Sequence, residues 1–238
     1  MKEFLRSLSK KILSPRSILG RMVINLFHWL WYYSPNSWMQ NTFIGYPIWQ
    51  CPFDLQLYQE IIVKTRPPFI IQTGVLHGGS VLYFASLLDL INAPPDAIVI
   101  GVDLVLTDKA KTLRHPRIRL IEGSSTDPAV VAQVRKLVSP LGGMVSLDSD
   151  HSQQHVLKEL MLYRDFVAVD SYLVVEDTNA NFRPIAPYHG PGPFEAVEDF
   201  LKTDKLFVRD NALWQRNLFS FHQYGWLKRV GNKTNSPG

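Results

Sequence analysis

The chain has 238 residues, of which 46% are hydrophobic and 19% are charged, and its formal net charge is +4. This composition excludes an intrinsically disordered protein, and the length suits one large α/β domain with an extension. The one cysteine, Cys51, excludes an internal disulfide, so a cytoplasmic location is expected. The basic residues form no face interleaved with aromatic residues, so nucleic acid is not an expected partner.

The first predicted element is a helix in the segment ILGRMVINLFHWLWYY, which follows several basic residues. Arg21, Asn25 and His28 interrupt its apolar pattern, and no small-residue cleavage site follows. These features favour an amphipathic helix over a signal peptide or a membrane span. We expect the helix to pack on the domain or on another copy of the chain in a homo-oligomer. The alternative is peripheral membrane contact through residues 16–33.

Strand and helix patterns then alternate along the chain. The expected strands are FIIQTG, AIVIGVD, RIRLIEGS, GMVSLD and SYLVVED, with helical spacing between them. This alternation indicates βαβ units, and therefore an α/β, Rossmann-like fold with a mostly parallel central sheet and helices on both faces. We expect a helical, aromatic extension over residues 1–50, the main domain over 51–230 and a tail over 231–238.

Polar clusters follow all five expected strands. They lie at residues 74–80, at Asp103, and at residues 123–126, 148–151 and 176–177. Ligands of an open parallel sheet bind at the carboxyl ends of its strands. Five successive strand ends with polar groups therefore favour one shared ligand site.

The turn after the first strand, QTGVLHGGS, contains Gly74, Gly78 and Gly79. Glycine lets the backbone turn sharply and approach a ligand, and the helix that follows favours an anionic group at its N-terminus. The spacing matches neither the dinucleotide fingerprint nor a P-loop. Asp103, at the end of the second strand, can accept hydrogen bonds from both hydroxyls of a ribose. A nucleoside without a diphosphate, such as S-adenosylmethionine (SAM), fits these features.

Carboxylates with the spacing of a metal site follow the last two strands. Asp148 lies 28 and 29 residues before Glu176 and Asp177, a separation of one helix and one strand. The three acids can converge and would repel one another without a cation, for which Mg²⁺ is the usual choice. His151 can take a proton from a substrate hydroxyl, and the alternative is that it caps a helix beside solvated acids. His155 is expected to pack or to form a hydrogen bond.

Several segments together resemble the cephalosporin hydroxylase family, also called the rhamnosyl O-methyltransferase family. They are QTGVLHGGSVLYFASLLD, GVD, HPRIRLIEGSSTDPAVVAQVR, VSLDSDHSQQHVLKEL, SYLVVEDTN and GPGPFEAVEDFL, within a resemblance that runs from about residue 41 to residue 230. The resemblance implies the class I SAM-dependent methyltransferase fold, with a metal site similar to that of catechol O-methyltransferase. The implied activity is Mg²⁺-dependent O-methylation of a hydroxyl on a sugar, a glycan or another natural product.

The resemblance also implies roles for individual residues. The methionine part of SAM would lie at Gly74, Gly78, Gly79 and Ser80, the ribose at Asp103, and the adenine near Ser124, Ser125 and Thr126. The metal ligands would be Asp148, Glu176 and Asp177, with Asp150 as a rival for the first. His151 takes the place of the lysine base of the catechol enzymes.

Gln72 departs from the family pattern, which has an acid two residues before the first glycine. Gln72 keeps the capacity to form hydrogen bonds but lacks the charge that attracts the cationic part of the cofactor. This departure supports the alternative of a non-catalytic cofactor-binding or scaffold subunit that assists a partner enzyme, such as a hydroxylase. Oxygenase chemistry in this chain itself is not expected, because none of its seven histidines has an acid two residues later. The segment TNANFRPIAPYHGPGP is expected to be a lid over the site.

Overall fold

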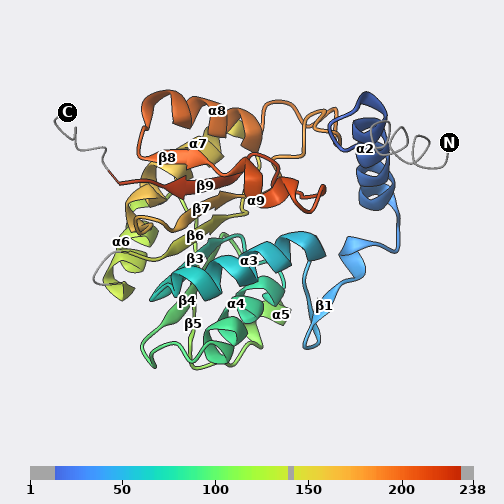
Figure 1. The fold of residues 1–238 in the computed structure, drawn as a ribbon. Helices are drawn as coiled ribbons and strands as arrows, with labels where there is room; N and C mark the ends of the chain where they lie inside the picture. Colours follow the sequence, from blue (N-terminus) through green and yellow to red (C-terminus); the bar gives the residue numbers. More distant parts are fainter. Residues whose placement is uncertain (1–13, 139–141, 232–238) are drawn as a thin grey trace.

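The computed structural model describes residues 14–138 and 142–231. A seven-stranded sheet lies between two layers of helices (Figure 1). Residues 1–13 of the expected extension and residues 232–238 of the expected tail lie outside the described residues. The expected α/β architecture with a mostly parallel sheet is confirmed.

The five expected strands form the parallel part of this sheet, in the order β5-β4-β3-β6-β7. They are β3 (Phe69–Thr73), β4 (Ile98–Asp103), β5 (Ile118–Glu122), β6 (Met144–Leu147) and β7 (Tyr172–Val175). Strands β3, β6 and β7 are buried at every residue, which explains their nearly continuous apolar runs. Gln72 is a buried polar residue within the run of β3, where it lies opposite Gly101 in β4 and Ser146 in β6.

Two further strands, which the sequence patterns did not reveal, extend the sheet beyond β7. They are β9 (Trp226–Arg229), antiparallel to β7, and β8 (Phe207–Arg209), antiparallel to β9. Both strands are short, and each contains partly or fully exposed residues, so neither produces a long buried run.

The helices cover both faces of the sheet (Figure 1). One face carries α6 (Pro128–Leu137), α7 (Gln153–Tyr163) and α8 (Pro193–Thr203), with the short 3₁₀ helix η2 (Arg164–Phe166) after α7. The other carries α3 (Pro52–Thr65), α4 (Gly79–Leu90), α5 (Asp108–Lys111) and α9 (Asn211–Gln215). Each layer buries an apolar cluster against the sheet.

The strand order creates a crevice between β3 and β6. The chain proceeds from β3 to β4 and β5 in one direction, then returns to place β6 and β7 on the other side of β3. Ligand sites of open α/β sheets lie at such a reversal, beyond the carboxyl ends of the strands. The glycine turn after β3 and the acidic loop after β6 are therefore neighbours.

The N-terminal extension begins with α2 (Ile18–Tyr33), which confirms the expected helix. The Ser17 hydroxyl caps it by accepting a hydrogen bond from the backbone N–H of Gly20 at 2.9 Å. The short helix η1 (Trp38–Gln40) and a hairpin of β1 (Thr42–Phe43) and β2 (Tyr46–Pro47) follow. None of the helices within the described residues has the length and hydropathy needed to cross a membrane.

Buried His28 fixes α2 to the domain. Its Nε2 lies 2.8 Å from Nδ2 of Asn179, in the loop after β7, and its ring stacks on Phe221 at 5.5 Å. Burial lowers the pKa of His28 to about 4, so this side chain is neutral in the folded protein at neutral pH. The extension is thus packed on the domain through a neutral, hydrogen-bonded histidine.

Candidate functional site

A cavity of about 730 Å³ opens at the carboxyl edge of the sheet. Most of the residues implied to bind SAM line it: Gly74, Gly79, Ser80, Asp103, Ser124 and Ser125. Pro47, Ile48, Trp49 and Gln50 also line it, so the end of the expected extension forms one wall. Gln72, Gly78 and Thr126 are not among the residues that line it.

The glycine turn is shaped by close backbone contacts. Gly74 has φ +77°, and a Cβ atom there would lie 1.8 Å from the backbone oxygen of Asp148. A Cβ atom at Gly79 would lie 2.2 Å from the backbone oxygen of Pro47, and Gly78 has φ +85°. Only glycine fits these positions, because a side chain would push apart the segments that form the cavity.

The Asp103 carboxylate holds the glycine turn in place. Its Oδ2 accepts hydrogen bonds from the backbone N–H groups of Val75 at 2.7 Å and Leu76 at 2.8 Å. Its Oδ1 has one long contact, with the backbone N–H of Val105 at 3.3 Å, and keeps the capacity to accept from a hydroxyl. Asp103 can therefore support the turn and receive a ribose at once.

The loop after β5 presents hydroxyl groups to the cavity. The Ser125 Oγ lies 3.1 Å from Nε2 of His155, and the Ser124 Oγ lies 3.3 Å from Oγ1 of Thr126. His155 also pairs with Glu159 at 3.7 Å, and this hydrogen-bond partner raises its pKa. His155 thus forms hydrogen bonds that position the loop.

Gln72 is fully buried, and neither atom of its amide has a partner within the described residues. A buried amide without hydrogen bonds is unfavourable, so such groups are usually satisfied by water or by a ligand. Gln72 therefore leaves unused hydrogen-bonding capacity behind the glycine turn.

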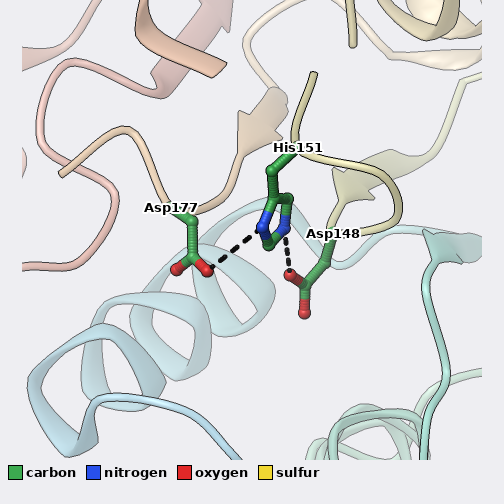
Figure 2. Close-up of side chains that lie close together, drawn as sticks. All are labelled: Asp148, His151 and Asp177. Atoms are coloured by element: carbon green, nitrogen blue, oxygen red, sulfur yellow. Dashed lines mark hydrogen bonds and ion pairs between the residues drawn. The ribbon is translucent and has the colours of Figure 1, made fainter. Parts of the chain in front are cut away.

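Asp148, His151 and Asp177 converge at the acidic edge of the cavity (Figure 2). The imidazole lies between the carboxylates, with Nε2 3.3 Å from Oδ1 of Asp148 and Nδ1 3.6 Å from Oδ2 of Asp177. One ligand atom from each residue lies within 4.8 Å of the others, a spacing that can hold a metal ion. The imidazole can therefore serve either as a metal ligand or as a base, because its one lone pair cannot do both.

The electrostatics of this cluster favour a cation. Burial raises the pKa of Asp148 well above its usual range, and the Glu176 carboxylate raises it further. Burial acts against the charged form of His151, but the hydrogen bond to Asp148 and the charge of Asp177 outweigh it and raise the His151 pKa to about 9. The acids thus stabilise positive charge between them, as in sites for divalent cations.

Asp150 lies outside this cluster. Its Oδ1 accepts a hydrogen bond from the backbone N–H of Ser152 at 2.7 Å, just before α7. Hydrogen bonding to Ser152 lowers the Asp150 pKa. In this geometry Asp150 supports the start of α7, whereas Asp148 faces His151.

Glu176 points into the protein beneath the cluster and is only 1% exposed. Its Oε1 accepts hydrogen bonds from Tyr58 Oη at 2.8 Å and from Ser146 Oγ, and its Oε2 accepts one from Gln50 Nε2. Gln50 Nε2 also lies 3.3 Å from Oδ2 of Asp148. The geometry joins Glu176 to the cluster through Gln50, rather than through a shared cation position.

His222, from the segment before β9, completes this buried network. Its Nδ1 accepts a hydrogen bond from the backbone N–H of Asp177 at 3.1 Å, which leaves Nε2 to donate to Glu176 at 3.3 Å. Gln50, Tyr58 and His222 were not found from the sequence, because each is an isolated polar residue in an apolar or turn-rich segment. The fold alone brings them together.

The segment after Asp177, expected to be a lid, borders both the site and α2. Arg183 pairs with Glu195 at 3.0 Å and lies 3.7 Å over the ring of Phe194. The backbone N–H of Ala186 donates to Oη of Tyr33 in α2 at 2.9 Å. Tyr188 of this segment is 98% exposed.

Two curated proteins are similar to this chain in sequence. The rhamnosyl O-methyltransferase of Mycobacterium tuberculosis strain H37Rv is 38% identical over 172 residues, which cover 71% of this chain and 70% of that protein. The rhamnosyl O-methyltransferase of Mycobacterium leprae is 38% identical over 202 residues, which cover 84% of this chain and 87% of that protein.

Solved structures share the fold at lower identity. A structure of CmcI with Mg and SAM has a TM-score of 0.61 at 20% identity, with 85% of this chain and 84% of that chain covered. An O-methyltransferase from Bacillus cereus in complex with SAH has a TM-score of 0.52 at 11% identity, with 69% and 74% covered. The family model described as Rhamnosyl O-methyltransferase/CmcI matches residues 35–230. The chain therefore belongs to the rhamnosyl O-methyltransferase/CmcI family.

Proposed function

We propose that this protein is an O-methyltransferase that transfers the methyl group of SAM to a sugar hydroxyl with the help of Mg²⁺. One observation carries the proposal. A single cavity joins the glycine turn and Asp103 to the cluster of Asp148, His151 and Asp177. The cofactor half and the metal half of the reaction thus face each other across one space.

The residues fit the two groups that the reaction needs. The close backbone contacts of Gly74 and Gly79 leave room for a ligand only in the absence of side chains. Asp103 keeps one carboxylate oxygen for a ribose, and Ser124 and Ser125 offer hydroxyls nearby. Asp148 and Asp177 supply hard oxygen ligands, which Mg²⁺ and similar divalent cations accept, and His151 lies between them in the position of a base.

When bound, SAM would supply a methyl group on a sulfonium, and Mg²⁺ would lower the pKa of a hydroxyl beside it. The substrate oxygen would bond to this methyl carbon as the C–S bond breaks, and the electron pair of that bond would stay on sulfur. The hydroxyl proton leaves to His151 or to water. Alignment of the reactants across the cavity supplies much of the rate.

His151 acts as a base only when it is deprotonated. The carboxylates of Asp148 and Asp177 hold its pKa at about 9 while no other cation shares their charge. A divalent cation between them would remove this effect and leave a neutral imidazole beside the substrate hydroxyl. We infer that Asp148, rather than Asp150, and Asp177 are the metal ligands, that Glu176 is held beneath them, and that His151 keeps its lone pair for the substrate proton.

The substrate class rests on the relatives. The two mycobacterial proteins are rhamnosyl O-methyltransferases, which supports a deoxysugar or a related sugar as the acceptor. The segment after Asp177, with exposed Tyr188, would contact this sugar. A cytoplasmic location and self-association stay predictions.

Isothermal titration of SAM into the protein, with Mg²⁺ and with a chelator, tests the proposal. We expect SAM to bind in both cases and expect Mg²⁺ to bind a site that Asp148→Ala removes. The non-catalytic scaffold is not favoured, because the acid and histidine cluster is complete at the edge of the cofactor cavity. Absence of SAM binding, or Mg²⁺ binding unchanged in Asp148→Ala, would contradict the proposal.

A further inference from the structure

Helix α2 exposes an apolar surface that nothing in the described residues covers. Its outward side chains include Ile18, Met22, Val23, Leu26, Trp29 and Leu30, which are between 49% and 73% exposed. We call this surface the outer face of α2. Contiguous exposed apolar surface of this kind marks an interaction site, whereas single exposed apolar residues are ordinary.

The inner side of α2 is a narrow stripe that already contacts the domain. Gly20 and His28 are its buried residues, and half-buried Ile24 lies between them at helical spacing. His28 binds Asn179, and Tyr33 binds the backbone of Ala186. The domain therefore uses one stripe of the helix, and the outer face is left for another partner.

The positive charge of the sequence is concentrated in its first 33 residues, which include α2. Residues 1–33 contain six of the 25 Lys and Arg residues but one of the 21 Asp and Glu residues. The net charge of this part is +5, and that of the other 205 residues is −1. A partner of the outer face thus meets a strongly basic segment of sequence, which favours an anionic surface.

A hollow beside α2 adds further positive charge. Its volume is about 1190 Å³, and four arginines line it: Arg16, Arg21, Arg183 and Arg216. Arg183 pairs with Glu195 and Arg216 with Glu60, whereas the side chains of Arg16 and Arg21 have no ion-pair partner among the described residues. Guanidinium groups next to an apolar face suit phosphate headgroups next to acyl chains.

We propose that the outer face of α2 docks the protein on an anionic phospholipid membrane. The helix lies along the surface, its apolar side chains enter the headgroup and acyl boundary, and Arg16 and Arg21 meet the lipid phosphates. Trp29 and Tyr33 belong to the residue types that prefer this boundary. A second copy of the chain fits less well, because two such faces would bring the +5 segments of both copies together.

Membrane docking would also orient the reaction site, although it does not rest on the proposed methyl transfer. The loop after Asp177 is bound to α2 through Asn179 and Ala186. Phe182 of this loop is 72% exposed and lines the arginine-rich hollow. A docked α2 therefore places this loop beside the lipid surface.

Sedimentation with vesicles tests the docking. The full chain is mixed with vesicles of phosphatidylcholine and phosphatidylserine, or of phosphatidylcholine alone, at low and at high salt. We expect binding to the mixed vesicles that weakens with salt, and a reduction of about tenfold or more in the double variant Met22→Glu and Leu26→Glu. The control variant Leu90→Glu and Val169→Glu makes the same charge change at side chains that are 76% and 56% exposed. It should bind like the wild type.

Three results would overturn the docking. They are absence of binding to the mixed vesicles, equal binding by the two double variants, and binding that is the same on neutral vesicles. A light-scattering measurement of mass decides for a second copy if the wild type is a dimer that Met22→Glu and Leu26→Glu dissociate. Thermal unfolding of each variant confirms that these exposed substitutions leave the fold intact.

Discussion

Replacement of Gly74 by alanine perturbs the contact on which the site depends. Gly74 has φ +77°, and a Cβ atom there would lie 1.8 Å from the backbone oxygen of Asp148, where ordinary contact begins at 3.4 Å. The glycine turn or the Asp148 loop must therefore move by roughly 1 Å or more, and such a displacement at a reaction site costs about a hundredfold in rate. The left-handed backbone adds about 1–2 kcal/mol of strain in the folded state.

Gly45→Ala is the matched control. Gly45 also has φ +77°, but a Cβ atom there would meet nothing within 4 Å. The strain is thus the same in both variants, and only Gly74→Ala displaces a neighbour. We expect Gly45→Ala to lose about 1–2 kcal/mol of unfolding free energy in urea, and Gly74→Ala to lose more, because it also displaces the Asp148 loop. Only Gly74→Ala should lose methyl transfer, by about a hundredfold in kcat/KM.

The outcome is measured as kcat/KM for transfer of labelled methyl from SAM to a rhamnosyl acceptor. Equal kcat/KM values for the two variants would refute the reasoning. They would mean that the close approach of the glycine turn to Asp148 does not position the reaction.

Three other substitutions, two of them paired with a control variant, test separate parts of the account. Asp148→Asn should lower Mg²⁺ affinity by at least about a hundredfold and Asp150→Asn by much less, measured by calorimetry, and equal losses would contradict the assignment of the ligand. Tyr58→Phe removes one of the donors to the buried Glu176 carboxylate, so it should cost about 1–3 kcal/mol of unfolding free energy and also weaken Mg²⁺ binding. Tyr83→Phe is the control, because its hydroxyl donates a hydrogen bond to a backbone oxygen away from the acidic cluster. An equal loss of Mg²⁺ binding in Tyr83→Phe would contradict a specific role of Tyr58. Because burial lowers the His28 pKa from 6.5 to about 4, the unfolded chain binds this proton first, and stability falls as the pH drops through that window. Between pH 7.5 and pH 5 the wild type should lose about 2 kcal/mol more than His28→Gln, and equal losses would exclude a buried neutral His28.

The parallel core of the fold was predictable from the sequence. The five parallel strands each had a β-rich run that ended in polar residues or glycine, and helical spacing separated them. The same patterns placed Gly74, Asp103 and Asp148 at one edge of the sheet, because parallel strands end together. The structure brings these residues to one cavity.

Other features depend on packing that local patterns do not encode. Strands β8 and β9 are short, and β9 is antiparallel to β7, so the alternation of strand and helix patterns did not predict them. Gln50 and His222 lie 172 residues apart and meet only beneath the acidic cluster. The orientation of Glu176 follows from these partners, which the sequence pattern could not reveal.

The structure of the N-terminal segment was also predictable only in part. Its helix was predictable from spacing, and the interruption at His28 marked a polar position. The partner of that position, Asn179, is 151 residues away. Only the folded chain therefore distinguishes the inner stripe of α2 from its outer face.

The most direct test of the central claim is transfer of labelled methyl from SAM to rhamnosyl and other hydroxylated acceptors, with Mg²⁺ and with a chelator. The account predicts a product methylated at oxygen, formed with Mg²⁺, lost with the chelator, and lost in the Asp148→Asn variant. Transfer that continues at the same rate in the chelator, or no transfer to any sugar acceptor by a protein that binds SAM, would contradict it.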